Sequence, residues 1–170
     1  KLDAVVRGLD AFEPVGGRSR ALTLRLDGRT VTLIDDTYNA NPDSVRAAID
    51  VLAELPAPRL LVLGDMGEVG NQGPEFHAEV GAYAAERGIE ALYTLGDLCV
   101  YSAQAFGAAR HFADMDSLLS AATGSLGEFR SVVVKGSRFM KMERVVQALQ
   151  SHSDDKNSQN KDKKGEPHAA

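Results

Sequence analysis

The sequence contains a single cysteine, Cys99, and no apolar run that approaches the roughly 20 residues of a membrane-spanning helix. One cysteine cannot form an internal disulfide, so the sequence is typical of a protein from a reducing compartment. Basic residues are also scarce, with 19 lysines and arginines against 24 acidic residues and a net charge of −5. Nucleic-acid-binding proteins usually present a basic surface, so we expect neither a nucleic-acid partner nor membrane insertion.

Signatures of several enzyme classes are missing as well. The chain has no G-x-x-x-x-G-K-[ST] phosphate loop, and no Ser-His-Asp or Cys-His arrangement stands out. The segment GDMGEVG lacks the G-x-G-x-x-G spacing of dinucleotide-binding enzymes, and its two acids would face a pyrophosphate, which disfavours a nicotinamide-dependent oxidoreductase. A flexible glycine turn is the alternative interpretation of this segment. His77 has no second ligand at metal spacing, so we predict no metal site.

The residues that are present predict an α/β fold. Apolar strand-like runs such as RLLVLGD, ALYTLGD and SVVVKGS alternate with segments whose apolar residues recur at helical spacing. Three helical faces are expected, formed by Val45, Ala48, Ile49 and Leu52, by Phe76, Val80, Tyr83 and Ala84, and by Met142, Val145, Val146 and Leu149. A further helix near 100–106 and a short strand near Arg110 lie between them. The runs LTLRL and VTLIDD flank Asp27-Gly28, which is a hairpin signal. The alternation predicts a Rossmann-like, mostly parallel sheet with helices on both faces.

Composition divides the chain into three parts. Residues 1–19 contain a short predicted helix, around 2–9, and the turn-rich stretch FEPVGGRSR, which suits a linker from an upstream domain. Residues 20–150 hold the alternating pattern and form the main domain. Residues 151–170 have almost no apolar side chains and mixed charge, so we expect a disordered polar tail. The chain begins with Lys1 rather than methionine and shows no signal peptide, so we expect a piece of a longer protein.

Charged residues follow the predicted strands, where open α/β sheets bind ligands. Asp35 and Asp36, Asp65, and Asp97 end three of them, and Lys135 ends a fourth. In DDTYNANPDS, Asn41 and Pro42 suit the cap and first position of a helix, whose acidic first turn would repel phosphate. This turn therefore favours a ribose or a base edge, with Asp36 accepting from hydroxyls. An equally weighted alternative is that Asn39 and Asn41 only cap the turn while the aspartates bond local backbone.

The segment VKGSRFMK predicts an anion site. Lys135 ends an apolar strand, Ser137 is placed to cap the final helix, and Arg138 and Lys141 lie beside the positive end of that helix. The alternative is a solvated basic helix start. The lysine at a strand terminus favours the anion site, because such a side chain is hard to leave unpaired.

Four segments, PVGGR, IDDTYNANPDS, VLGDMGEVG and VVKGSRFMKME, resemble the Mur ligase family in this order, over residues 1 to about 150. The second and fourth resemble the branch that ligates D-alanyl-D-alanine. The resemblance implies an enzyme of the bacterial cytoplasm with three domains, of which this is the last. The first domain would hold the UDP end of UDP-N-acetylmuramoyl-tripeptide. The central domain, ending within residues 1–19, would hold Mg²⁺ and the ATP phosphates, so the chain alone would lack activity.

The resemblance also implies roles for single residues. Arg18 matches an arginine at the domain junction that would reach the terminal phosphate of ATP, and Lys135 would touch the dipeptide or the acyl-phosphate intermediate; both are candidate catalytic residues. Thr37 stands where a serine is common. The other matches would lie against adenosine (Asp36, Tyr38, Asn39, Asn41 and Pro42), line the cleft near the acceptor (Asp65, Met66 and Glu68), or hold D-alanyl-D-alanine (Ser137, Arg138 and Phe139).

A free-standing α/β module that binds a nucleotide or another protein without catalysis is the alternative function. The two hypotheses differ in what precedes Lys1. An upstream reading frame with a G-x-x-G-K-[ST] motif would favour the ligase, whereas an initiator methionine just before Lys1 would favour the module.

Overall fold

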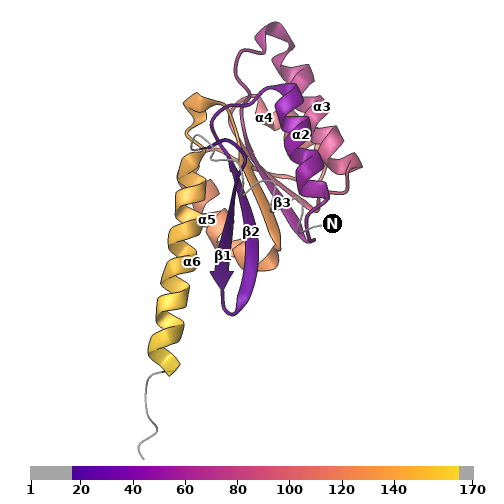
Figure 1. The fold of residues 1–170 in the computed structure, drawn as a ribbon. Coiled ribbons are helices and arrows are strands. Elements are labelled where there is room, and N and C mark those ends of the chain that lie inside the picture. The colour runs from indigo at the N-terminus through magenta and orange to yellow at the C-terminus, as the bar shows by residue number, and fades with distance from the viewer. Residues whose placement is uncertain (1–16, 165–170) are drawn as a thin grey trace, which may run out of the picture.

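The computed structural model describes residues 17–164, with side chains as far as Gln159. The predicted helix around 2–9, most of the linker 1–19 and the last six residues lie outside the described residues. The described chain forms one sheet covered by helices on both faces, which confirms the predicted fold class (Figure 1). Within this part of the chain, no helix is both long and apolar enough to cross a membrane.

Six strands form the sheet in the order β1-β2-β6-β3-β4-β5. Their bounds are β1 Arg20–Leu26, β2 Arg29–Asp36, β3 Arg59–Gly64, β4 Ala91–Leu95, β5 Arg110–Phe112 and β6 Ser131–Lys135. All neighbouring strands are parallel except β1 and β2, which form the hairpin predicted at Asp27-Gly28. Both turn residues have positive φ, 50° and 80°, as a two-residue turn with the twist of a hairpin requires.

Five described helices cover the sheet. α2 Pro42–Ala53, α3 Gly73–Glu86 and α4 Cys99–Phe106 lie on one face, and α5 Met115–Ser125 and α6 Glu143–Lys164 lie on the other (Figure 1). The predicted face of α2 is confirmed, because its four apolar residues are all buried. α5 was not predicted. It begins at Asp114, whose side chain accepts a hydrogen bond from the backbone N–H of Ser117, and it buries Leu118 and Ala122.

The central strands β2, β6, β3 and β4 divide their side chains between two apolar cores. In β2, Leu33 packs on the α5 and α6 side, whereas Ile34 packs on the α2 side. Because side chains alternate along a strand, the aspartates that follow must also point to opposite faces. Burial of each large apolar side chain stabilises the fold by about 1.5–3 kcal/mol, so the two cores fix the register of β2 and with it the direction of both carboxylates.

The expected disordered tail is wrong for residues 151–164, which continue α6 to Lys164. The hydroxyl of Ser153 donates to the carbonyl oxygen of Arg25 at 2.7 Å and accepts from the N–H of the same residue at 3.1 Å. The side-chain amide of Asn157 donates to the same carbonyl at 3.0 Å. β1 is an edge strand, and its outward backbone groups need partners that a polar helix supplies. Polar composition therefore does not prevent this segment from folding against the sheet.

Candidate functional site

The carboxyl ends of β2, β6 and β3 lie side by side, and three loops leave the sheet there. Backbone hydrogen bonds join these loops directly. The N–H of Gly67 donates to the carbonyl oxygen of Ala40 at 3.3 Å, and the N–H of Ser137 donates to that of Asp65 at 2.9 Å. The N–H of Tyr38 donates to the carbonyl oxygen of Gly17 at 2.8 Å, which ties the segment before β1 to the same edge. The loops therefore form one connected platform.

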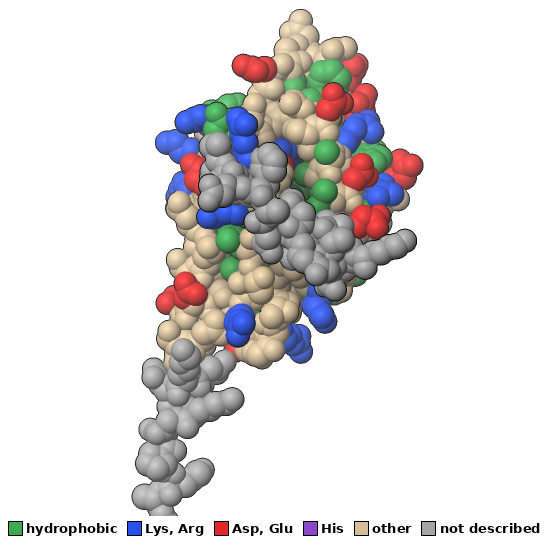
Figure 2. Space-filling model, viewed as in Figure 1, with side chains coloured by type: hydrophobic (Ala, Val, Ile, Leu, Met, Phe, Trp, Pro, Cys, Tyr) green, Lys and Arg blue, Asp and Glu red, His purple; other side chains and the backbone are tan. Residues whose placement is uncertain are grey.

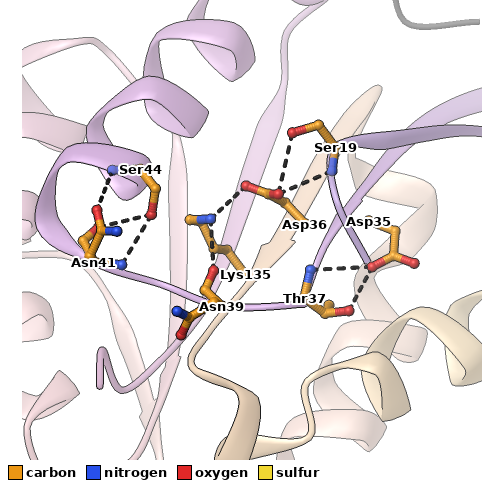
Figure 3. Close-up of polar contacts among 8 residues, drawn as sticks. All are labelled: Ser19, Asp35, Asp36, Thr37, Asn39, Asn41, Ser44 and Lys135. Atoms are coloured by element: carbon orange, nitrogen blue, oxygen red, sulfur yellow. Dashed lines mark hydrogen bonds and ion pairs between the residues drawn. The ribbon is translucent and has the colours of Figure 1, made fainter. Parts of the chain in front are cut away.

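Lys135 and Asp36 form a buried ion pair at the centre of this platform (Figure 3). The lysine Nζ lies 2.6 Å from Asp36 Oδ2 and donates to the carbonyl oxygen of Asn39 at 2.9 Å. The other carboxylate oxygen of Asp36 accepts from the backbone N–H of Ser19 at 3.0 Å and from its hydroxyl at 3.3 Å. Ser19 has a left-handed φ of 47°, which this carboxylate holds in place. Both charges were expected from the sequence to be available to ligands, but in the structure each neutralises the other.

The turn after β2 uses its polar residues mainly to begin α2. The side-chain oxygen of Asn41 accepts from the N–H of Ser44 at 2.8 Å, and the Ser44 hydroxyl accepts from the N–H of Asn41 at 3.0 Å. This reciprocal cap, with Pro42 at the first helical position, satisfies backbone donors that would otherwise lack partners. The capping interpretation is thereby confirmed for Asn41. Asn39 differs: its side chain is exposed and, among the described residues, has no hydrogen-bond partner.

Two cavities of about 340 Å³ each flank the end of β2, one on each face of the sheet. The first, here called the α2-side cavity, lies between α2 and the sheet. Its polar lining includes Arg18, Ser19, Asp36 and Lys135, and its walls are apolar side chains that include Ile34, Ala48 and Val133. A mostly apolar cavity with a few polar groups on one side is typical of sites for small organic ligands.

The second, here called the α6-side cavity, lies where β1 begins and α6 begins. It is lined by Arg20, Asp35, Thr37, Tyr38, Arg138 and Glu143. An Nη atom of Arg20 lies 3.5 Å from Asp35 Oδ2, and the Thr37 hydroxyl donates to Asp35 Oδ1 at 2.7 Å. Figure 3 shows Asp35 and Asp36 directed to opposite sides of the strand. Arg20 was not predicted from the sequence, although the register of the predicted hairpin pairs it with Asp35.

The ring of Tyr38 lies close to two guanidinium groups. The Cζ atoms of Arg18 and Arg138 lie 4.2 Å and 5.2 Å from the ring centroid. Such cation–π contacts stabilise by about 0.5–1 kcal/mol at exposed sites and hold otherwise flexible side chains in place. Figure 2 shows lysine and arginine side chains gathered over the amino-terminal end of α6, where Arg138 is exposed. On the face that Figure 2 shows, this edge of the sheet therefore presents a group of basic side chains.

Asp65 and Met66 are buried rather than lining either cavity. The Asp65 carboxylate accepts from the backbone N–H of Cys99 at 2.7 Å and of Leu98 at 3.2 Å, at the start of α4. His77 Nε2 accepts from the N–H of Met66 at 3.0 Å, so this imidazole holds the loop after β3 from inside the protein. These two side chains therefore point into the protein, whereas the resemblance implied that they line the cleft near the acceptor.

Asp65, His77 and Cys99 place potential metal-ligating atoms within 4.8 Å of one another. Their geometry does not suit Mg²⁺, which prefers six oxygen ligands, several of them water. Both ring nitrogens of His77 are in hydrogen bonds, the second to the carbonyl oxygen of Gly73 at 2.6 Å. Burial, followed by the nearby Asp65 charge, raises the pKa of the Cys99 thiol well above its usual value. The cluster therefore has a structural role.

The other predicted site residues lie at the rim. Glu68 is exposed with a left-handed φ of 56°, and Phe139 has 65% of its surface exposed. The expected cap of the final helix by Ser137 is wrong, because the 3₁₀ turn Arg138–Met140 intervenes and α6 begins only at Glu143. Ser137 is instead buried, and its hydroxyl has no hydrogen-bond partner within the described part of the chain.

Comparison with known proteins adds to this geometry. Residues 19–138 match a family described as Mur ligase, glutamate ligase domain. The chain is 39% identical over 153 residues to the UDP-N-acetylmuramoyl-tripeptide–D-alanyl-D-alanine ligase of Escherichia coli K12, an alignment that covers 89% of this chain and 33% of the relative. The enzyme of the same name from Bacillus subtilis 168 is 33% identical over 153 residues, covering 84% and 32%.

Solved structures with a similar fold carry related names. A MurF structure from Acinetobacter baumannii matches with a TM-score of 0.73 and 28% identity, covering 89% of this chain and 34% of that one. A MurF ligase from Thermotoga maritima in complex with ADP matches with a TM-score of 0.72, covering 89% and 36%, and at 22% identity it supports the fold alone. The chain spans about a third of the length of its curated relatives.

Proposed function

The chain belongs to the Mur ligase family, and from this premise we propose that residues 20–150 are the carboxyl-terminal domain of an ATP-dependent ligase of bacterial peptidoglycan synthesis. The whole enzyme would act in the cytoplasm and join D-alanyl-D-alanine to UDP-N-acetylmuramoyl-tripeptide. The observation that carries the proposal is the similarity, at 39% identity, to a relative with that activity in its name. Residues 1–19 would link this domain to the upstream domains of the same polypeptide.

The proposed reaction has two steps. ATP first transfers its terminal phosphate to the free carboxylate of the tripeptide, which gives an acyl phosphate and ADP. The amine of D-alanyl-D-alanine then attacks the acyl carbon, an amide bond forms, the bond to phosphate breaks, and the amine nitrogen loses a proton. We assign Mg²⁺ and the ATP phosphates to the central domain. This domain would orient adenosine and the dipeptide, so that the second step becomes effectively intramolecular.

The predicted adenosine-contacting residues fall into two groups. Asp36, Asn41 and Pro42 hold the turn in shape, as their hydrogen bonds and position at the start of α2 indicate. Tyr38 and Asn39 offer a ring face and an unpaired amide that a nucleoside could contact. Arg18 is exposed and braced against Tyr38, which suits a residue that reaches the terminal phosphate from the rim. We therefore propose that Tyr38, Asn39 and Arg18 contact ATP directly, whereas Asp36 acts through the loop.

The proposal is tested with the full-length protein. We expect it to convert ATP, UDP-N-acetylmuramoyl-tripeptide and D-alanyl-D-alanine to ADP, phosphate and the pentapeptide product, detected by mass spectrometry. Omission of the dipeptide should abolish product formation. A full-length protein that binds nucleotide but forms no product under these conditions would favour the alternative of a binding module without catalysis.

A further inference from the structure

We infer that the α6-side cavity receives the carboxylate of the incoming dipeptide and that Arg20, together with Arg138, determines specificity for it. This inference rests on the proposed function, since it names the subsite for one substrate of that reaction. It adds Arg20 and Glu143 to the residues expected from sequence. It places the dipeptide carboxylate on the α6 side of β2, in a cavity that the ring of Tyr38 also lines.

Asp35 occupies only part of the hydrogen-bonding capacity of Arg20, which leaves donors for an anionic ligand. Asp35 is its only ion-pair partner within the described part of the chain, at 3.5 Å. The carboxylate of Asp35 is itself fixed, because Oδ1 accepts from the N–H of Thr37 at 3.3 Å and from its hydroxyl at 2.7 Å. The Nε atom of Arg20 is buried without a hydrogen-bond partner among the described residues. A buried unpaired donor is costly, and a ligand oxygen would remove that cost.

Arg138 approaches the same cavity from the loop after β6, beside the ring of Tyr38. Two planar guanidinium groups that line one cavity are suited to a carboxylate, whose two oxygens accept hydrogen bonds in pairs. At about 340 Å³ the cavity has the size of a site for a small molecule. A peptide of two alanines is such a molecule.

The charges that line the cavity favour a zwitterion over a phosphate. The two arginines are matched by two acids, Asp35 and Glu143. A dipeptide carries one negative and one positive charge, so it can enter without unbalancing the site. A phosphate would bring about two negative charges beside both acids, and like charges at close range disfavour binding. The carboxylate of Glu143 therefore disfavours the binding of phosphate or nucleotide in this cavity.

The first test measures the kinetics of full-length enzyme with free D-alanyl-D-alanine and with the same dipeptide amidated at its carboxyl end. The wild-type enzyme should prefer the free acid. Arg20→Gln should raise KM for the free dipeptide about 10-fold or more, since it removes a charge-assisted hydrogen bond from a side chain that is 43% exposed. KM for ATP and kcat at saturating dipeptide should hold. The preference for the free acid over the amide should shrink by the same factor.

Controls separate the subsite from general effects. Arg29→Gln removes an exposed arginine at the far end of the hairpin and should leave every constant unchanged. If Arg20→Gln lowers the melting temperature sharply, Arg20→Lys carries the test, because it keeps a charge beside Asp35 but loses the planar fork. Glu143→Gln should make inorganic phosphate a several-fold stronger competitor of the dipeptide.

The outcomes separate failure of the proposed function from failure of the carboxylate subsite. If the wild-type enzyme does not ligate D-alanyl-D-alanine, the proposed function fails. If it does, but a folded Arg20 variant keeps the full wild-type preference for the free acid over the amide, the function stands and the carboxylate subsite is overturned.

Discussion

The buried pair between Lys135 and Asp36 allows a quantitative prediction about stability. Lys135 is 2% exposed and 15% of the Asp36 side chain is exposed, so water screens this pair little. Lys135→Met keeps the length of the side chain but leaves the Asp36 carboxylate without its cation. Breaking a buried pair by removal of one partner costs roughly 3–5 kcal/mol. We take the lower end, about 3 kcal/mol, because Asp36 retains two hydrogen bonds to Ser19.

The assay is urea and thermal unfolding of the 170-residue chain. For a protein of this size, about 3 kcal/mol corresponds to a fall in Tm of roughly 6–12 °C. Asp36→Asn should also destabilise, because it leaves the buried ammonium group unmatched and removes the acceptor charge at Ser19. The double variant should be destabilised by at least about 1 kcal/mol less than the sum of the single effects, since the two side chains are in direct contact.

Additive effects of the two substitutions, to within about 0.5 kcal/mol, would refute the reasoning, because independent sites behave in that way. So would a Lys135→Met chain with wild-type stability. The prediction departs from the expectation from sequence that Asp36 lies against adenosine and accepts hydrogen bonds from its hydroxyls. In the full-length enzyme, a loss of ATP affinity on Asp36→Asn would then reflect a displaced loop, and Asn39→Ala should weaken ATP binding without the loss of stability.

Three further predictions test other contacts. Gly81→Ala should lower the free energy of unfolding in urea by about 1–3 kcal/mol, since the added methyl group would overlap the backbone of α4. The matched control is Gly124→Ala in α5, whose added methyl group has no atom within 4 Å and should be neutral or slightly stabilising. Cys99 should resist iodoacetamide at pH 8 in the folded protein and react in denaturant, and strong labelling of the folded protein would contradict its burial. Because the pKa of its thiol is raised in the folded state, the free energy of unfolding should fall as the pH rises through the ordinary titration range of a thiol. Ser153→Ala should destabilise by about 1–2 kcal/mol and speed hydrogen exchange at the Arg25 amide, whereas unchanged exchange would mean that α6 does not protect the β1 edge.

Sequence predicted the elements whose apolar residues repeat regularly. The buried strands and α2 are of this kind, because their periodicity is the direct consequence of one buried face. α5 was not predicted because its sequence, MDSLLSAATGS, is short and rich in serine, threonine and glycine. The two apolar residues that it buries, at i and i+4, are therefore a weak signal. The helical continuation through 151–164 was not predicted because it depends on hydrogen bonds to an edge strand rather than on apolar packing.

The sequence predicted that charged residues gather at one edge of the sheet, since the carboxyl ends of parallel strands meet there, and the structure brings Asp36 and Lys135 together at that edge. The partners of its charges were not predictable. Lys135 pairs with Asp36 only because β6 lies between β2 and β3, and these residues are 99 positions apart in the chain. Asp65 turns inward because the start of α4 offers two N–H groups. Both facts follow from strand order and helix placement, which residue spacing does not contain.

The alternation at the end of β2 also determines which mutations this protein tolerates. Asp35 and Asp36 serve opposite faces, and the two-residue turn at Asp27-Gly28 fixes the register of the whole hairpin. A single-codon insertion or deletion within β2 would exchange the two faces, sending the carboxylate that holds Lys135 toward Arg20 and the reverse. Point substitutions change one cavity at a time. In a deep mutational scan of this hairpin we therefore expect in-frame length changes to be depleted far more strongly than substitutions at the same positions.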